Sequence, residues 1–256
     1  MADVAQFYDD LSAYYHLLFD DWGMTVQRQG KLITALLSEE LGPGPKKILD
    51  GACGIGTQAL GLAGQGHDVR ASDLSPVAVA RAKREAEASE LPIKFSVADL
   101  RALSGYYSGP FDVVCAFDNA LPHLEREDLP LALAEMASLL APGGLLIASL
   151  RDYDALKESR PRAEVARVLD GPEGRRVVFQ TWDWRHDGQG YRVNQYILQH
   201  QPDSLVADTM IFSTDYWCVT RKELAAALRA ADLEQVHWVE PAESGYYQPI
   251  VVARRG

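Results

Sequence analysis

From residue 47 to residue 151 the sequence alternates short apolar runs, typical of buried strands, with longer amphipathic runs, typical of helices. The expected strands are KILD, HDVRASD, IKFSVAD, FDVVCAFD and LLIASLRD. Between them lie runs such as SPVAVARAKREAEASE, in which Ser75 followed by Pro76 is a suitable helix start. This alternation predicts a mostly parallel sheet with helices on both faces.

Outside residues 47–151 the pattern of apolar and polar residues is different. Residues 1–45 contain FYDDLSAYYHLLFDDW, whose apolar side chains recur at near-helical spacing, and we expect a helical lid there. Residues 152–218 contain HDGQG between two β-rich runs, then LVADTMIFSTDYWCV, and predict a small antiparallel β insert on the substrate side. Residues 219–256 hold a capping-box helix and two closing strands, which continue the core of residues 46–151.

Charge and cysteine content narrow the function classes. A net charge of −11 disfavours nucleic-acid partners, and no apolar run is long enough to span a bilayer. The acidic start MADVAQFYDDL does not resemble a signal peptide, so we expect a cytoplasmic protein. Cys53, Cys115 and Cys218 lack metal-ligand or disulfide spacing, which predicts free thiols and no metal site. A small-molecule substrate is the expected partner, and a homo-oligomer is compatible with the sequence.

The stretch ILDGACGIGTQ, residues 48–58, joins the first expected strand to a helix. Side-chain-poor residues let the backbone turn tightly and let a ligand lie directly on the chain. Open α/β sheets bind ligands at this edge. The turn satisfies a GxGxxA dinucleotide fingerprint, and Asp73 lies about where an acid that holds a ribose is expected. The side-chain-poor positions are Gly51, Ala52, Gly54 and Gly56.

Further motifs resemble those of class I S-adenosylmethionine-dependent methyltransferases. Asp50 ends the first strand, ADL follows the third strand, LAPGG precedes the fifth, and a strand pair closes the chain. The resemblance implies a Rossmann-like fold with a seven-stranded sheet, S-adenosylmethionine as cofactor and S-adenosylhomocysteine as product. It also implies that Asp73 accepts hydrogen bonds from the ribose hydroxyls, that Asp99 contacts the adenine amino group, and that the small-residue turn lies under the methionine part.

Within this class the chain resembles glycine and sarcosine N-methyltransferases. The shared features are Ala52 in place of a motif glycine and the segments YHLLFDDW, FDNALPHL and SLRDYD. The resemblance implies that Arg151 clasps a substrate carboxylate, that Asn119 orients the substrate, and that Arg28 pairs with the carboxylate of the cofactor's methionine moiety. Paired hydrogen bonds from a guanidinium suit the first role. The structural alternatives are an ion pair of Arg151 with Asp152 or Asp154, a loop cap by Asn119 and a solvated helix face for Arg28.

Several other side chains are candidates with two interpretations. His123 could accept a proton, but a lone histidine in a proline-containing loop is more often a structural partner. The aromatic rings of Tyr8, Tyr15 and Trp22 could stabilise a sulfonium or an amine, or could simply pack. Insert residues that share strand faces could form a substrate wall or attach the insert to the core. These insert residues are Trp182, Trp184, Tyr191 and Val193.

The candidate sites can be stated as two sets. The expected cofactor-binding residues are Tyr15, Trp22, Arg28, Asp50, Gly51, Ala52, Gly54, Asp73, Leu74, Asp99, Leu100 and Phe117. The expected catalytic residues are Asn119, Arg151, His123 and Tyr15. The expected function is methyl transfer to the nitrogen of a small amino acid such as glycine, sarcosine or dimethylglycine. Two alternatives stay open: an N- or O-methyltransferase of another small molecule or natural product, and a non-catalytic S-adenosylmethionine-binding regulator.

Overall fold

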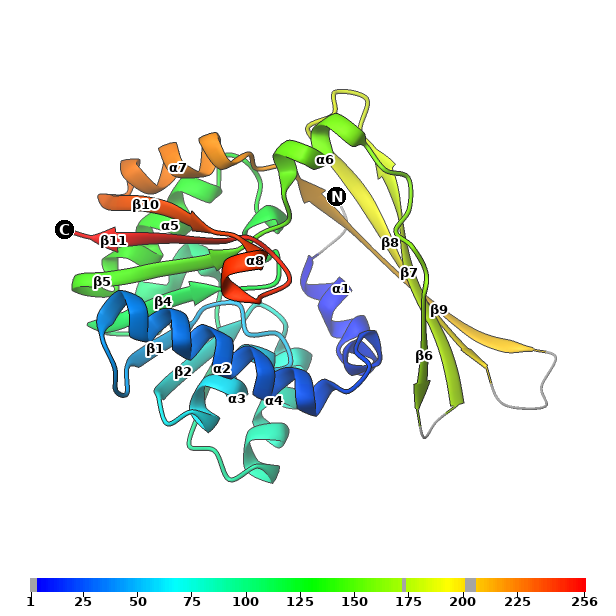
Figure 1. Cartoon of the computed structure of the whole chain (residues 1–256), viewed down its shortest axis with the longest axis horizontal. Coiled ribbons are helices and arrows are strands. Elements are labelled where there is room, and N and C mark those ends of the chain that lie inside the picture. Colours follow the sequence, from blue (N-terminus) through cyan, green and yellow to red (C-terminus); the bar gives the residue numbers. More distant parts are fainter. Residues whose placement is uncertain (1–3, 172–173, 201–205) are drawn as a thin grey trace.

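The computed structural model describes residues 4–171, 174–200 and 206–256, and in this part of the chain the strands form two sheets (Figure 1). The first sheet has the order β10-β11-β5-β4-β1-β2-β3, and the second has the order β6-β7-β8-β9. The strands of the first sheet are β1 (Lys47–Asp50), β2 (Asp68–Asp73), β3 (Lys94–Val97), β4 (Phe111–Ala116), β5 (Leu140–Ser149), β10 (Leu233–Val239) and β11 (Ile250–Arg255). Those of the second are β6 (Arg167–Gly171), β7 (Gly174–Trp184), β8 (Gly190–His200) and β9 (Ala207–Trp217).

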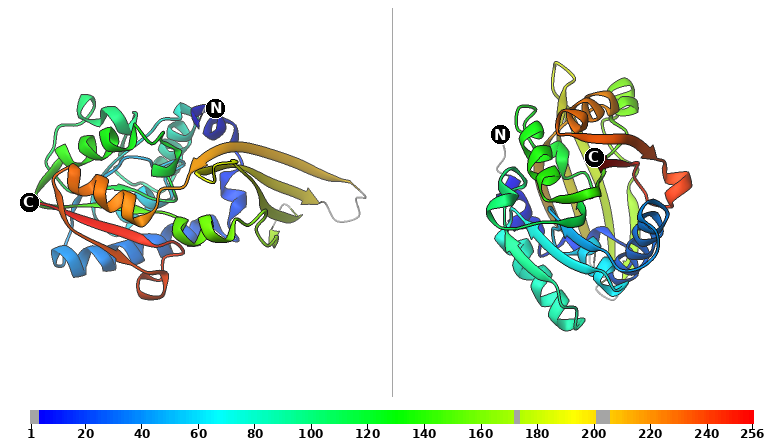
Figure 2. Two further views of the ribbon diagram at one scale, coloured as in Figure 1. Left: turned by 90° about the horizontal axis from the view of Figure 1, so that it is seen from above. Right: turned by 90° about the vertical axis from the view of Figure 1, so that its left-hand side faces the viewer.

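Five strands of the first sheet run parallel, from β3 to β5 in space, and β11 is antiparallel to β5. Helices link the strands and cover the sheet (Figure 2). The helices are α1 (Val4–Leu11), η1 (Tyr15–Leu18), α2 (Trp22–Leu41), α3 (Thr57–Gly64), α4 (Pro76–Ala88), η2 (Leu100–Gly105), η3 (Leu121–His123), α5 (Leu129–Ser138), α6 (Tyr153–Ser159), α7 (Arg221–Ala230) and α8 (Pro241–Ser244). The expected doubly covered, mostly parallel seven-stranded sheet is confirmed.

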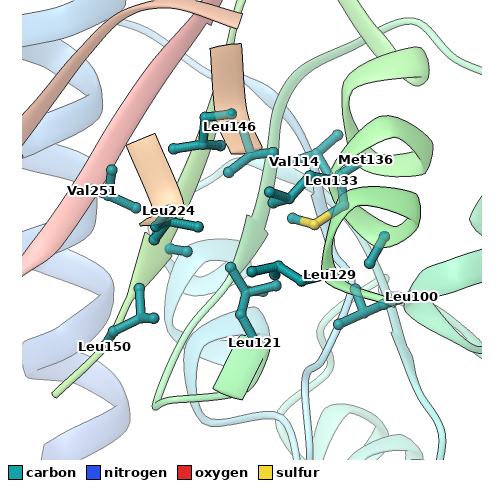
Figure 3. Packing of buried hydrophobic residues seen from close by; sticks show 14 of the residues in the cluster. Leu100, Val114, Leu121, Leu129, Leu133, Met136, Leu146, Leu150, Leu224 and Val251 are labelled. Carbon is teal, nitrogen blue, oxygen red and sulfur yellow. The ribbon is translucent and has the colours of Figure 1, made fainter. Parts of the chain in front are cut away.

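Alternation along the strands divides the core into two apolar layers. In β5, Leu146 belongs to one buried cluster, while Leu145 and Ile147 belong to the other. Figure 3 shows the first layer, in which the leucines and Met136 of α5 face strands β4, β5 and β11. The second layer packs α2 and α3 against the opposite face. Side chains of a strand alternate between faces, so both faces of this sheet are buried under helices.

Local signals set the helix ends as the sequence predicts. Ser75 caps α4 by accepting a hydrogen bond from the Ala78 amide at 3.0 Å. Thr220 and Glu223 form the expected capping box at the start of α7. Each cap satisfies amides that the first helical turn leaves without partners, which favours the helix start at that position.

The second sheet contains the predicted hairpin, β7 and β8, together with β9. Its base shares the first apolar layer with the core through Trp182, Tyr191 and Tyr216, and its other end projects away from the body of the protein (Figure 2). Strand β6 and helix α6 are absent from the sequence prediction. Both are short, and β6 is largely exposed, so neither has a clear apolar period.

The amino-terminal segment lies between the two sheets, where α1 contacts both β9 and α4 (Figure 1). On the insert side, buried Arg176 donates hydrogen bonds to the carbonyl oxygens of Leu17 at 2.8 Å and Phe19 at 2.6 Å. On the core side, the Ser75 hydroxyl donates to the Asp9 carboxylate at 2.5 Å. The segment is therefore tied to both sheets.

Replacing Arg176 with methionine should lower the free energy of unfolding by about 2–4 kcal/mol, because the substitution removes charged donors from the buried Leu17 carbonyl and the partly buried Phe19 carbonyl. Urea denaturation measures the change. The matched control is Arg175→Met, because Arg175 is an exposed neighbour whose ion pair with Asp170 is screened by solvent and should contribute little to stability. Equal losses in the two variants would contradict the proposed tie.

Candidate active site

A cavity of about 300 Å³, called here the turn cavity, lies at the carboxyl ends of strands β1, β2 and β4. Its volume is at the lower end of the range for small-molecule sites. It is lined by Val4, Tyr8, Tyr15, Gly51, Ala52, Cys53, Gly54, Ile55, Thr57, Gln58, Asp73, Leu74, Ala98, Asp99, Leu100, Arg101, Phe117, Asp118, Ala120, His123, Leu124, Glu125 and Asp128.

The glycine turn and Asp73 hold each other in place at this cavity. The Gly54 amide donates to Oδ2 of Asp73 at 2.8 Å, and the Ser75 amide donates to Oδ1 at 2.9 Å. Gly54 has a φ of 52°, and a Cβ built on it meets no atom within 4 Å, so the backbone here faces open space. Burial raises the pKa of Asp73 above its usual range, and the backbone amides of Ser75, Gly54 and Leu74 oppose this shift. A carboxylate has about four acceptor positions, so Asp73 keeps capacity for a ligand.

Asp99 is fixed by Arg101, which donates from Nη2 at 2.6 Å and from Nε at 3.1 Å to Oδ2. Burial raises the pKa of Asp99, but the hydrogen bonds from Arg101 outweigh it and hold the pKa below its usual range. Leu74 and Leu100, each next to one of the two acidic residues, also line the turn cavity. The cavity thus combines two fixed carboxyl groups with apolar walls.

Asp50 lies beneath the turn rather than in the cavity wall, with no exposed surface. Its Oδ1 accepts a hydrogen bond from the Ala52 amide at 3.3 Å, and its Oδ2 has no partner among the described residues. Burial raises the pKa of this carboxyl from 3.8 to about 8, an effect that the Ala52 amide opposes. Asp50 therefore carries a proton over much of the neutral range.

The raised pKa of Asp50 predicts a pH dependence of stability. Between about pH 4 and about pH 8 the folded state holds the Asp50 proton and the unfolded state has lost it, so the free energy of unfolding falls as pH rises. Each such proton contributes a slope approaching about 1.4 kcal/mol per pH unit. Asp50→Asn should flatten the curve by about that slope, measured by urea unfolding across this range. Asp68→Asn, at an exposed position, should leave the slope unchanged, and an unchanged slope in Asp50→Asn would contradict the assignment.

A second cavity of about 1170 Å³, the sheet cavity, lies beside the turn cavity. The lid, α2, the insert sheet and the segment before β11 supply most of its walls. Only Tyr8, Tyr15 and Asp118 line both cavities within the described chain, so the two spaces meet at these side chains. The lining residues used below are Arg28, Asn119, Arg151, Glu164, Gln180, Trp182, Val193, Gln195, Tyr216 and Tyr247.

Arg151 faces the sheet cavity just past the end of β5. Its Nη1 donates to the Tyr191 hydroxyl at 2.8 Å, and its Nη2 donates to Oε1 of Gln180 at 2.7 Å. Its closest carboxylate is that of Glu164 at 3.6 Å, not that of Asp152 or Asp154. Because a guanidinium carries five donors, Arg151 keeps N–H groups for a ligand.

Asn119 is buried next to Arg151 and has a left-handed backbone with a φ of 68°. Its Oδ1 accepts hydrogen bonds from the Arg151 amide at 3.2 Å and the Tyr153 hydroxyl at 3.0 Å. Its buried Nδ2 has no hydrogen-bond partner among the described residues. The amide therefore combines a loop-fixing acceptor with an unused donor at the cavity wall.

His123 lines the turn cavity and lies among aromatic rings. Its Nε2 and the Tyr8 hydroxyl are 2.8 Å apart, and its ring centroid lies 4.3 Å from that of Tyr216. Burial lowers the pKa of His123 to about 3. A neutral histidine with so low a pKa is a weak base, so the structure favours the structural role over proton transfer.

Besides Asp50, two further candidates predicted to bind the cofactor do not line the turn cavity. Arg28 lines the sheet cavity instead. Trp22 lines neither cavity, and its indole donates to the Thr57 hydroxyl at 2.9 Å, at the start of α3. Tyr15 lies where the two cavities meet.

Some of the predicted insert residues line a cavity, and others pack the insert against the core. Trp182 and Val193 line the sheet cavity. Tyr191 stacks on Trp182 with ring centroids 4.9 Å apart, and Trp184 packs against the same core cluster without lining the cavity. One face of the insert thus both attaches it to the core and forms a cavity wall.

Sequence reasoning missed several lining side chains. Glu164, Gln180 and Gln195 lie in the insert, where no motif marks a polar residue as part of a site. Tyr247 lies in the short GYYQP segment before β11. The paired tyrosines in that segment, at the ligand edge of the sheet, were the available signal.

Comparison with known proteins agrees with this architecture. Residues 48–144 match the family model described as a methyltransferase domain. The glycine/sarcosine N-methyltransferase of Parasynechococcus marenigrum (strain WH8102) is 37% identical over 139 residues, which cover 54% of this chain and 48% of the relative. The demethylmenaquinone methyltransferase of Thermus thermophilus is 40% identical over 105 residues, covering 40% of this chain and 46% of the relative. The chain spans about half the length of the curated relatives it matches.

Solved structures show the same fold. Streptomyces venezuelae DesVI has a TM-score of 0.77 at 19% identity and covers 100% of both chains. CalS10, an amino pentose methyltransferase from Micromonospora echinaspora, has a TM-score of 0.74 at 20% identity and covers 95% of each chain. The chain therefore has the class I, Rossmann-like fold of these structures, and its residues 48–144 match a methyltransferase domain. Among curated relatives, the domain is similar to that of glycine/sarcosine N-methyltransferases.

Three further observations bear on partners. Within residues 4–171, 174–200 and 206–256, no helix is both long and apolar enough to cross a bilayer. The same residues hold no cluster of three or more histidine, cysteine or acidic side chains placed to bind a metal ion. Cys53, Cys115 and Cys218 are buried free thiols.

Proposed function

We propose that the protein is an S-adenosylmethionine-dependent N-methyltransferase whose acceptor is a carboxylated amine. The first candidates are glycine, sarcosine and dimethylglycine. The observation that carries the proposal is the placement of Arg151 and Asn119, which present unused N–H groups to the sheet cavity beside its junction with the turn cavity.

The turn cavity fits the cofactor by the chemistry of its walls. Open space above Gly54 leaves room for a ligand on the backbone, and the fixed Asp73 carboxylate can accept hydrogen bonds from a diol. Asp99 offers an acceptor farther along the same cavity, with Leu74 and Leu100 as apolar walls. When bound, S-adenosylmethionine supplies an electrophilic methyl group on a sulfonium. Arg28, from the sheet cavity, is the proposed partner of its carboxylate.

The chain's own task is positioning. Methyl transfer needs a neutral nitrogen in line with the methyl carbon at roughly 3–3.5 Å, more than it needs a strong base. Arg151 would hold the acceptor's carboxylate through paired hydrogen bonds, and the free Nδ2 of Asn119 would add a third donor. Tyr8 and Tyr15, where the cavities meet, present aromatic groups toward a cationic centre.

The cavity volume supports a second candidate, a larger carboxylated amine such as a natural-product intermediate. At about 1170 Å³ the sheet cavity is above the usual range of roughly 300–1,000 Å³ for drug-sized ligands. Glycine would leave most of that space to water. The same Arg151 would serve as the carboxylate handle for the larger substrate.

A mass-spectrometric assay of methyl addition tests the proposal. The panel pairs glycine, sarcosine, dimethylglycine and larger amino acids with amines of similar size that lack a carboxylate. Conversion of the carboxylated members supports the proposal, and the members converted distinguish the two candidates. Conversion of none, with S-adenosylmethionine bound in a thermal-shift assay, would favour a non-catalytic binder. Stabilisation by NAD rather than S-adenosylmethionine would overturn the cofactor assignment.

A further inference from the structure

Asp118 is a side chain that the candidate sites above leave without a role. It follows β4 after one residue, in a left-handed conformation with a φ of 54°, and its carboxylate lies where the two cavities meet. A group at this junction is close to both the methyl donor and the acceptor of the proposed reaction. What it can bind therefore bears directly on substrate choice.

The hydrogen bonds of Asp118 come from neutral donors. Its Oδ1 accepts from the hydroxyls of Tyr246 at 2.5 Å and Tyr247 at 2.7 Å, and its Oδ2 accepts from Nε2 of Gln58 at 2.8 Å. Gln58 is itself fixed by Oε1 of Gln29 at 2.7 Å. Oδ2 thus accepts one hydrogen bond where a carboxylate oxygen can accept two.

Within the described part of the chain, the charge of Asp118 is not compensated by a cation. Among the described residues, no arginine, lysine or histidine forms an ion pair with Asp118. A partly buried carboxylate without a counter-charge is unfavourable, and a cationic ligand would relieve that state. Burial also raises the pKa of Asp118, as expected for a carboxyl that lacks a cation.

A second observation at the same place points to a ligand. The adjacent Asn119 lines the sheet cavity and is buried, and its Nδ2 has no partner among the described residues. With Arg151, the wall therefore offers donors for an anion, while Asp118 offers an acceptor for a cation. The donors of Arg151 and Asn119 therefore suit the carboxylate of a zwitterion, and Asp118 suits its cationic nitrogen.

We infer that Asp118 is a specificity-determining residue that binds the cationic nitrogen of the acceptor, so that the site selects zwitterionic amines over other carboxylates. This inference rests on the proposed function and narrows its substrate class. The carboxylate is assigned a binding role only. Methyl transfer still requires the neutral amine, so the ammonium proton must pass to water before the nitrogen attacks the methyl carbon.

The test measures ligand binding to the S-adenosylhomocysteine-loaded protein by calorimetry, with a pair of isosteres. Dimethylglycine, standing for the best acceptor of the panel, carries a cationic nitrogen, and 3-methylbutanoate has carbon in its place. We expect the wild type to prefer dimethylglycine at least tenfold. In Asp118→Asn this preference should fall below about threefold, which corresponds to a loss of at least about 0.7 kcal/mol. Affinity for S-adenosylhomocysteine should change less than twofold.

Two variants complete the experiment. Asp68→Asn removes one negative charge at an exposed position at the start of β2 and should keep the full preference. Asp118→Ser keeps a hydroxyl acceptor for the two tyrosines and should repeat the loss, which covers the case in which Asp118→Asn does not fold.

Three results would overturn the inference. The first is an unchanged preference in folded Asp118 variants while methyl transfer persists, which leaves the proposed function standing. The second is a loss of S-adenosylmethionine affinity with an unchanged preference, which would assign the carboxylate to the sulfonium. The third is a wild type that binds neither isostere and methylates no member of the panel, which would remove the proposed function as well.

Discussion

Asp73→Ala is expected to weaken binding of S-adenosylmethionine by about a hundredfold, or about 2.7 kcal/mol. The substitution removes the proposed acceptor for the ribose hydroxyls. It also removes the acceptor of the Gly54 and Ser75 amides, so the turn loses the side chain that fixes it. Calorimetric titration with S-adenosylmethionine and S-adenosylhomocysteine measures the effect, and both ligands should lose affinity equally because they share the ribose.

Two controls separate the ribose contact from a general loss of structure. Asp73→Asn keeps the shape of the side chain and one acceptor oxygen, and should lose less affinity than Asp73→Ala. Asp68→Asn lies at the opposite end of the same strand and should bind as the wild type does. A folded Asp73→Ala protein with unchanged affinity would reject the ribose assignment.

Arg151→Lys is expected to lower kcat/KM for carboxylated acceptors by about a hundredfold, mainly through KM, while cofactor affinity changes less than twofold. Lysine cannot reproduce paired hydrogen bonds to a carboxylate. It also lacks the separate Nη1 and Nη2 donors that bridge Tyr191 and Gln180, and the flat face that lies over the Trp182 ring, whose centroid is 4.8 Å from the guanidinium carbon. Steady-state kinetics with the panel acceptors measures the effect.

The matched control is Arg192→Lys, because Arg192 is an exposed residue of the insert that pairs with Asp215 and lines neither cavity. It should leave kcat/KM within about twofold. If Arg151→Lys impaired amines without a carboxylate as strongly as amino acids, Arg151 would be a structural residue rather than the carboxylate handle.

The sequence predicts the core sheet and the edge at which it binds ligands because both depend on local periodicity. Each core strand carries apolar residues on two faces, and the carboxyl ends of parallel strands meet at one edge. This is why Asp73 and Asp99 line one cavity. Strand β6 lacks such a pattern, so only its pairing with β7 defines it.

Positions that depend on distant contacts could not be predicted. The orientation of α2, and with it the side on which Arg28 lies, depends on how α2 packs against α3. A Cβ on Gly30 would lie 2.4 Å from the backbone of Gly61, so the two helices pack in close backbone contact. Asp118 is similar, because Tyr246 and Tyr247 lie 128 and 129 positions away along the chain.

The double attachment of the amino-terminal segment has a consequence for synthesis of the protein. Arg176 follows its acceptor Leu17 by 159 positions, so the ribosome makes strands β1 to β5 before it makes this partner of Leu17. At about 5–20 residues per second, the interval is roughly 8–30 seconds. Phe7 and Leu17 are buried in the folded protein, but during that time the insert sheet that helps to cover them has not been made. A nascent chain arrested before β7 would therefore lack the insert sheet and also β10 and β11 of the core sheet, and it would expose the apolar side chains of its amino-terminal segment, which is the kind of intermediate that chaperones bind.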